Sequence, residues 1–77
     1  MNVNVIIFGQ LTDITGTHAI TVTDVSDTNG LVAQLNSNYP GLTHATYAMA
    51  VDGTIISGNT NLADKSTIAL LPPFSGG

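Results

Sequence analysis

The chain contains no cysteine, no arginine and no glutamate, and its only lysine is Lys65. Without cysteine it can form no disulfide, hold no thiolate-bound metal and use no thiol nucleophile. That absence is compatible with a reducing compartment. A single lysine cannot neutralise the phosphates of a nucleic acid, and it supplies no basic face for an anionic membrane surface. The sequence therefore predicts neither nucleic-acid nor membrane binding.

Long apolar runs are also missing. No run could span a bilayer, and no charged-then-apolar signal segment opens the chain, so we expect a cytoplasmic protein. Threonine and asparagine fill many polar positions, and five aspartates carry the negative charge. We therefore expect little long-range electrostatic steering of partners toward this chain. Partner recognition should therefore depend on apolar contacts and backbone hydrogen bonds. No metal site is expected, because the separation of His18 and His44 gives no ligand spacing.

The 77 residues, 43% of them apolar, predict one folded domain with a modest core. Apolar patterning predicts strands at residues 2–8, 18–23, 47–51, 54–57 and 67–71. The nearly continuous apolar stretch at residues 5–8 predicts a central strand that is covered on both faces. Residues 9–16 are expected to form a loop, anchored by Leu11 and Ile14.

One helix is predicted, from Thr28 to about Tyr39. Either Asp27 or Thr28 is expected to cap its first turn, because a side-chain oxygen there can accept an otherwise unpaired backbone N–H. Pro40 ends the helix. Several residues in it are mediocre helix formers, so packing against a sheet must stabilise it.

The order strand, strand, helix, strand, short strand, strand predicts an α+β fold of the β-grasp type. We expect a mixed sheet of four to five strands with one main helix packed on one face. The first and last strands should lie side by side and parallel, a pairing that requires a long crossover connection. Residues 1–71 are assigned to this domain, and residues 72–77 to a flexible C-terminal tail.

The tail reads PPFSGG and is the most specific feature of the sequence. Two prolines favour a stiff, extended exit from the last strand. The final glycines have no Cβ and can pass through a slot that any side chain would block. A carboxylate on Gly77 would be ionised at neutral pH and could be activated as an acyl adenylate. The residues expected to thread into a partner are Pro72, Pro73, Phe74, Ser75 and Gly76.

The order of elements, the stretch FGQLTDITG and the ending LADKSTIALLPPFSGG resemble the ubiquitin-like sulfur carriers. The nearest resemblance is to the MoaD family, the small subunit of molybdopterin synthase. It implies a chain that is not catalytic alone and binds no cofactor. An E1-like adenylating enzyme would activate Gly77 with ATP, and a sulfur donor protein would convert the carboxylate to a thiocarboxylate.

By the same resemblance, the tail would enter the large, catalytic subunit of the synthase. There the thiocarboxylate would give its sulfur to a cyclic pyranopterin precursor during molybdenum cofactor biosynthesis. Gly77 then carries the sulfur, Gly76 forms a slender neck, and the two prolines guide the exit. The resemblance also assigns an apolar patch that faces the partner: Phe8, Ile55 and Leu71.

The chain departs from the family pattern in one turn. Members commonly carry Asp-Gly-Asp before the last strand, where this sequence has Asp64, Lys65 and Ser66. The left-handed conformation that glycine allows costs a lysine more, so we expect a differently shaped turn.

Three other functions remain open from the sequence. The chain could be a ubiquitin-like protein modifier, with Gly77 joined to a lysine through an isopeptide bond. It could carry sulfur for another pathway, such as thiamine thiazole synthesis or a tungsten cofactor. It could also be a β-grasp interaction module without tail chemistry.

Overall fold

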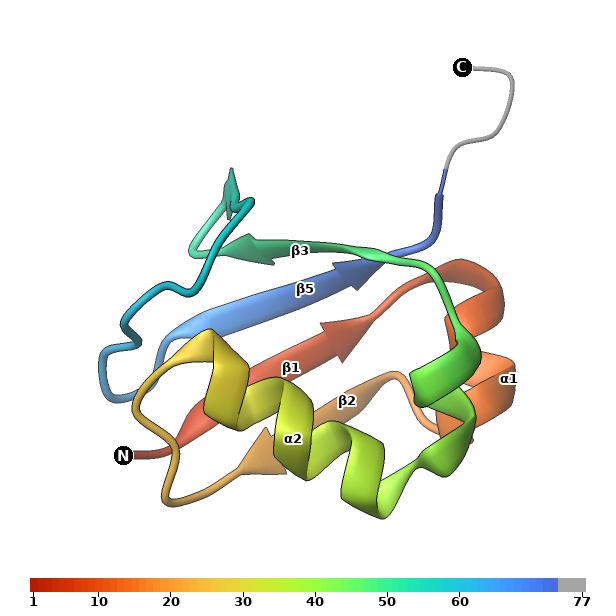
Figure 1. Cartoon of the computed structure of the whole chain (residues 1–77), viewed down its shortest axis with the longest axis horizontal. Coiled ribbons are helices and arrows are strands. Elements are labelled where there is room, and N and C mark those ends of the chain that lie inside the picture. The colour runs from red at the N-terminus through yellow and green to blue at the C-terminus, as the bar shows by residue number, and fades with distance from the viewer. Residues whose placement is uncertain (74–77) are drawn as a thin grey trace.

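The computed structural model describes residues 1–73 (Figure 1). One mixed five-stranded sheet carries one long helix, as predicted, and every predicted strand is present, shortened by at most two residues at an end. The elements run β1 (Val3–Ile7), η1 (Gly9–Leu11), α1 (Thr12–Thr15), β2 (Ala19–Val22), α2 (Thr28–Asn38), η2 (Pro40–His44), β3 (Ala48–Val51), β4 (Thr54–Ile55) and β5 (Thr67–Leu71).

The sheet has the strand order β2-β1-β5-β3-β4, which places β5 at its centre. β1 pairs in parallel with β5, with Val5 opposite Ile68, so the predicted neighbouring of the first and last strands is confirmed. The other pairings are antiparallel. Between β3 and β4, Asp52 and Gly53 both have positive φ angles, at 49° and 89°, which confirms the predicted tight turn.

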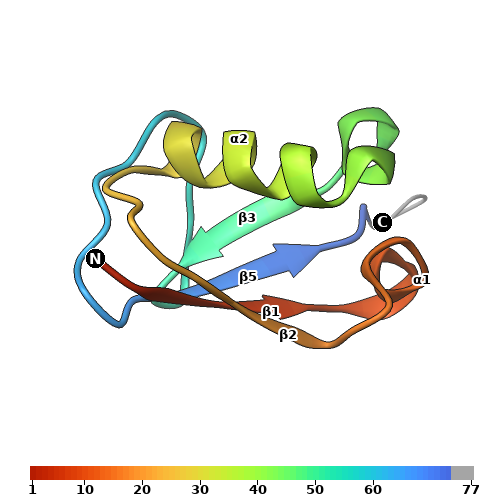
Figure 2. The ribbon, with the colours of Figure 1, turned by 90° about the horizontal axis from the view of Figure 1, so that it is seen from below.

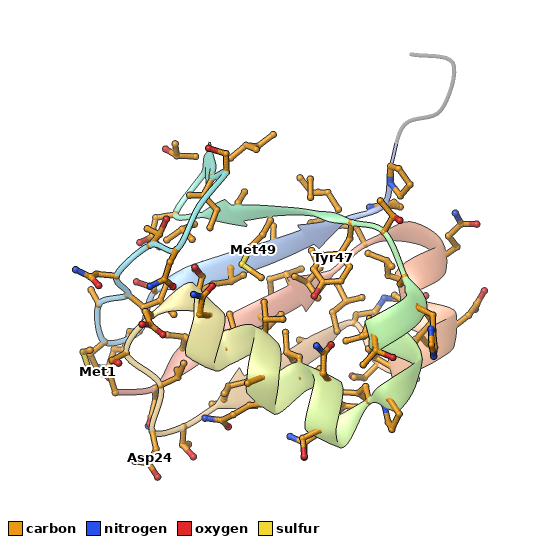
Figure 3. The ribbon with its side chains drawn as sticks, in the orientation of Figure 1. Met1, Asp24, Tyr47 and Met49 are labelled. Atoms are coloured by element: carbon orange, nitrogen blue, oxygen red, sulfur yellow. The ribbon has the colours of Figure 1, made fainter. Side chains whose placement is uncertain are left out.

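The core lies between the sheet and α2, which crosses one face of it (Figure 2). Alternate residues of each strand point toward α2, because successive side chains of a strand lie on opposite faces. Met49 of β3 is buried there and Tyr47 is half-buried beside it (Figure 3). The fully buried side chains of β1, β5 and α2 are Val3, Val5, Ile7, Ile68, Leu70, Leu31 and Leu35.

The prediction that β1 is covered on both faces is wrong. Val3, Val5 and Ile7 are buried, but Asn4 is exposed and Ile6 is only half-buried. The reason is that α2 covers one face, and within residues 1–73 no helix lies over the other (Figure 2).

Residues 9–16, predicted as a loop, form two short helical turns, η1 and α1. Thr12 Oγ1 donates a hydrogen bond to the carbonyl of Gly9 at 2.8 Å, and Gly16 ends the second turn with a φ of 74°. Leu11 is buried, as expected of an anchor, whereas Ile14 is 37% exposed.

The start of α2 is capped from two places in the chain. Asp27 Oδ1 accepts a hydrogen bond from the backbone N–H of Gly30 at 2.8 Å, as one of the two predicted caps. Asn59, in the segment after β4, accepts from the backbone N–H of Asn29 at 2.8 Å and donates to Asp27 Oδ2 at 3.2 Å. These bonds, from Gly30 first and Asn59 second, hold the pKa of the Asp27 carboxyl below its ordinary value.

Candidate functional site: the tail exit and the outer apolar face

The central strand β5 delivers the chain to the point where the tail begins. Next to its end, the backbone N–H of Phe8 donates to the carbonyl of Leu70 at 3.1 Å, extending the β1–β5 pairing. Gly9 follows with a φ of 59°, and a Cβ placed on it would lie 2.9 Å from Pro72 Cγ. Glycine at position 9 therefore lets Pro72 lie against the backbone beside β1. This contact positions the first residue of the tail.

Pro73 is exposed and is the last residue that the structure describes. It lines a cavity of about 370 Å³ together with residues of η1, α1 and the segment after η2, among them Leu11, Ile14 and Ala45. The predictions for Phe74, Ser75, Gly76 and Gly77 concern residues outside the described part of the chain. For these residues the threading and sulfur-bearing roles stay predictions.

The side of the sheet opposite α2 carries a continuous apolar surface, which we call the outer apolar face. The strand register decides its members: Ile6 lies opposite Ala69, Ala69 opposite Ala50, and Ala50 opposite Ile55. Leu71 lies opposite Ala48 in the same way. The residues of the outer apolar face are Ile6, Phe8, Ala19, Ala48, Ala50, Ile55, Ala69 and Leu71, of which Ala50 is buried.

The three residues of the predicted patch share this face. Phe8 and Leu71 flank the tail exit, and Ile55 lies on the edge strand β4. Phe8 is 46% exposed and Ile55 is 66% exposed, while Leu71 is half-buried. Large apolar side chains exposed on one surface are typical of a site that binds another protein. Their role as partner contacts is still a prediction.

Sequence reasoning missed other parts of this site. It did not find Gly9, whose contact with Pro72 joins two segments far apart in the sequence. Nor did it find that Ala48, Ala50 and Ala69 join the patch. The alternation of large and small residues at positions 47–51 could have indicated a smooth surface there, because small side chains lie between the large inward-facing ones.

A second cavity, of about 290 Å³, lies beside the start of α2. Its apolar lining includes Val32, Tyr47, Met49 and Ile56. Burial raises the pKa of the Tyr47 hydroxyl, because the charged form is poorly solvated there. Within residues 1–73 no three His, Asp, Glu or Cys side chains come together as a metal site. In the same range, no helix is long and apolar enough to cross a membrane.

Comparison with known proteins places the chain in a family. The sequence model of the ThiS family matches residues 5–77, so the match includes the tail. The chain belongs to the ThiS family. It is a ubiquitin-like sulfur carrier of the ThiS and MoaD type, which confirms the family resemblance of the sequence. A search of curated protein sequences gives no match.

Solved structures share the fold over nearly its full length. Small archaeal modifier protein 1 from Methanosarcina acetivorans has a TM-score of 0.86 and 23% identity, covering 99% of this chain and 96% of that one. A Pyrococcus furiosus protein assigned as molybdopterin converting factor subunit 1 has a TM-score of 0.87 and 15% identity, covering 95% and 98%. These neighbours confirm the ubiquitin-like β-grasp fold.

A third similar structure is a complex of subunits 1 and 2 of the molybdopterin-converting factor from Helicobacter pylori. The matching chain has a TM-score of 0.78 and 29% identity, with 100% of both chains covered. That protein therefore exists in a complex of its two subunits.

Proposed function

We propose that this chain is the small, sulfur-donating subunit of a molybdopterin synthase. The similarity to one chain of the Helicobacter pylori complex supports this proposal, because it covers 100% of this chain and 100% of that chain at 29% identity. The observation that carries the proposal is the position of Pro72. It follows the central strand, packs against Gly9, and lies beside the outer apolar face. A partner that binds this face would receive the tail in a defined direction.

The outer apolar face is the docking surface in this proposal. Phe8 and Ile55 expose apolar area that would be removed from water when the large subunit binds, and such burial is favourable at about 25 cal/mol per Å². The chain has one lysine and five aspartates, so charge pairing contributes little to the contact. At the edge of the face toward β2, Ala19 lies opposite Ile6, and the next pair on this side is polar, with Asn4 opposite Thr21.

The tail chemistry follows from a terminal carboxylate on Gly77. One carboxylate oxygen attacks the α-phosphorus of ATP on an adenylating enzyme, and pyrophosphate leaves. Sulfide supplied by a donor protein then attacks the carbonyl carbon, and AMP leaves with the electrons of the broken C–O bond. The thiocarboxylate sulfur forms a C–S bond to a carbon of the pyranopterin precursor in the large subunit and displaces an oxygen leaving group from that carbon. Water then attacks the acyl carbon of Gly77 and breaks its bond to sulfur, which releases the tail as the carboxylate and leaves the sulfur on the pterin.

Mass spectrometry of the protein purified from its native host tests the proposal. We expect a mature chain that ends at Gly77, part of it with one oxygen replaced by sulfur. Deleting Gly77 should abolish conversion of the pyranopterin precursor in an assay with the large subunit, the adenylating enzyme and a sulfur donor. Thr21→Ala is the control, because Thr21 is exposed on β2 and the substitution leaves the whole tail unchanged. A mature chain that extends beyond Gly77, or a Gly77 deletion with normal activity, would overturn the proposal.

A second candidate function is protein modification, in which Gly77 is joined to a lysine. One observation favours it: the chain shares its fold, at a TM-score of 0.86, with a protein named as a modifier. The search for conjugates must allow for the composition of this tail. Trypsin cleaves after lysine and arginine, and Lys65 is the last such residue. A tryptic digest would therefore leave residues 66–77 on the acceptor lysine, and a search for diglycine remnants would miss them.

A further inference from the structure

We propose that Lys65 is the acceptor through which one copy of this chain is joined to the Gly77 carboxyl of another. The inference rests on the proposed activation of Gly77 and adds a second use for the activated carboxyl. An isopeptide bond needs a side-chain amine, and Lys65 is the only one among 77 residues. The α-amine of Met1 is the competing nucleophile.

The turn that carries Lys65 is held in place while the side chain is exposed. Asp64 Oδ1 accepts from the backbone N–H of Asn2 at 2.8 Å, and the N–H of Lys65 donates back to the carbonyl of Asn2. Ser66 is buried, and its Oγ accepts from the N–H of Ala63 at 3.1 Å. Lys65 itself is exposed. The amine is thus presented to solvent from a fixed backbone.

The backbone at Lys65 disfavours this residue type. The predicted change in the shape of this turn is wrong: the φ of Lys65 is 66°, so a lysine occupies the left-handed conformation that the family resemblance assigns to glycine. A side chain with a Cβ costs about 1–2 kcal/mol in that conformation. Within residues 1–73, the two other non-glycine residues with positive φ are Asp24 and Asp52, and aspartate tolerates this region better. Asp52 also gains a hydrogen bond at 2.9 Å from the N–H of Thr67. Strain of this kind points to function when stability does not explain the residue.

Lys65 precedes β5 and is hydrogen-bonded to Asn2, whereas the tail follows β5, so the two lie at opposite ends of this strand. At the rise of a strand, Ser66 and Pro73 are roughly 23 Å apart. The four residues after Pro73 reach at most about 14 Å when fully extended, and the remaining gap is longer than a lysine side chain. A tail that starts from Pro72, packed on Gly9, therefore favours the lysine of a second copy over its own. Both ends of one copy can be engaged at the same time.

The reaction needs no reagent beyond the ATP that activates the carboxyl. The neutral Nζ of Lys65 attacks the carbonyl carbon of the Gly77 adenylate on another copy. A C–N bond forms, the C–O bond to AMP breaks with its electrons on AMP, and the nitrogen releases a proton to water. Because each copy offers one lysine and one activated carboxyl, the products are linear chains with a single type of linkage.

The test combines the whole chain with ATP and the adenylating enzyme of its host. ATP–pyrophosphate exchange reports activation of Gly77, and a denaturing gel reports joined copies. We expect a ladder of multimers from the natural chain and its complete loss in Lys65→Arg, which keeps the charge but removes the reactive amine. Trypsin cannot cleave after a joined Lys65, so the digest should contain residues 1–77 with residues 66–77 attached at Lys65.

A second variant tests whether an exposed lysine at another position can also act as the acceptor. Thr21 is exposed on the outer side of β2. Thr21→Lys in the Lys65→Arg background therefore offers a new exposed lysine on the sheet, away from the turn at position 65. We expect no ladder from it. Three results would overturn the inference and leave the proposed function standing. They are a ladder that persists in Lys65→Arg, a ladder that is restored by Thr21→Lys, and ATP–pyrophosphate exchange without any ladder. Absence of exchange would overturn both.

Discussion

Leu70 and Leu71 are identical neighbours on β5, yet they belong to different surfaces of the molecule. Leu70 is fully buried beneath α2, and Leu71 is half-buried on the outer apolar face next to the tail exit. Because side chains alternate along a strand, one residue step moves a leucine from the core to the outer apolar face. Apolar residues therefore have two kinds of environment in this sheet. Those on the inner face stabilise the fold, and those on the outer face are available to a partner.

The largest effect on stability is expected on the inner face. Leu70→Ala should lower the free energy of unfolding by about 2–5 kcal/mol, because it removes buried methyl groups and leaves a cavity. Leu71→Ala should cost about 1 kcal/mol or less, since its side chain already contacts water. Urea unfolding of the two variants measures the difference. Equal losses would show that the two faces do not differ as described.

A charge placed on the outer apolar face should lower the affinity for the large subunit. Among residues 1–73, Ile55 is the most exposed large apolar residue, at 66% exposure. Ile55→Asp places a charge there and should weaken binding to the large subunit about tenfold or more, a loss of roughly 1.4 kcal/mol. Its unfolding midpoint should stay close to that of the natural chain. Titration calorimetry measures the affinity. Thr21→Asp adds the same charge at the opposite, polar edge of the face, and we expect it to bind normally. Equal weakening by both variants would argue against the outer apolar face as the docking surface.

Two glycine variants test whether the contact between Gly9 and Pro72 contributes to sulfur transfer. Gly9→Ala and Gly16→Ala both place a Cβ at positive φ, at 59° and 74°, which costs about 1–2 kcal/mol of backbone energy. Only at Gly9 would the new atom also lie 2.9 Å from Pro72, whereas nothing lies within 4 Å of it at Gly16. We therefore expect Gly9→Ala to reduce sulfur transfer beyond its effect on stability. Gly16→Ala should transfer sulfur normally once corrected for the folded fraction, and similar losses in both variants would contradict the role of Pro72.

The smallest effect concerns the helix that covers the inner face. Because folding lowers the pKa of Asp27, its carboxylate contributes stability that is present above the ordinary pKa of 3.8 and is lost as the pH falls through the folded-state pKa. Asp27→Asn keeps a capping oxygen but does not titrate in this window. Below pH 3.8, the natural chain should lose stability relative to Asp27→Asn, as measured by thermal unfolding across this pH range. Parallel pH profiles for the two proteins would show that the cap does not depend on ionisation.

Much of the fold could be predicted because its signals are local. Apolar alternation indicated the strands, Asp27 and Pro40 bounded the helix, and Asp52 with Gly53 marked the turn. The two-sided burial of β1 could not be judged, since an apolar run does not report how many layers cover it. The cap from Asn59 was also hidden, because it crosses about thirty residues of sequence.

The candidate site, too, could be predicted only in part from the sequence. The sequence by itself determined the chemical identity of the tail, the single lysine and the apolar character of the strands, since these depend only on which residues follow one another. Only the tertiary structure decided that Phe8, Ile55 and Leu71 share one uncovered face, that Gly9 receives Pro72, and that Lys65 lies at the far end of β5. These relations depend on strand register and crossover, which arise when distant segments pair across the sheet.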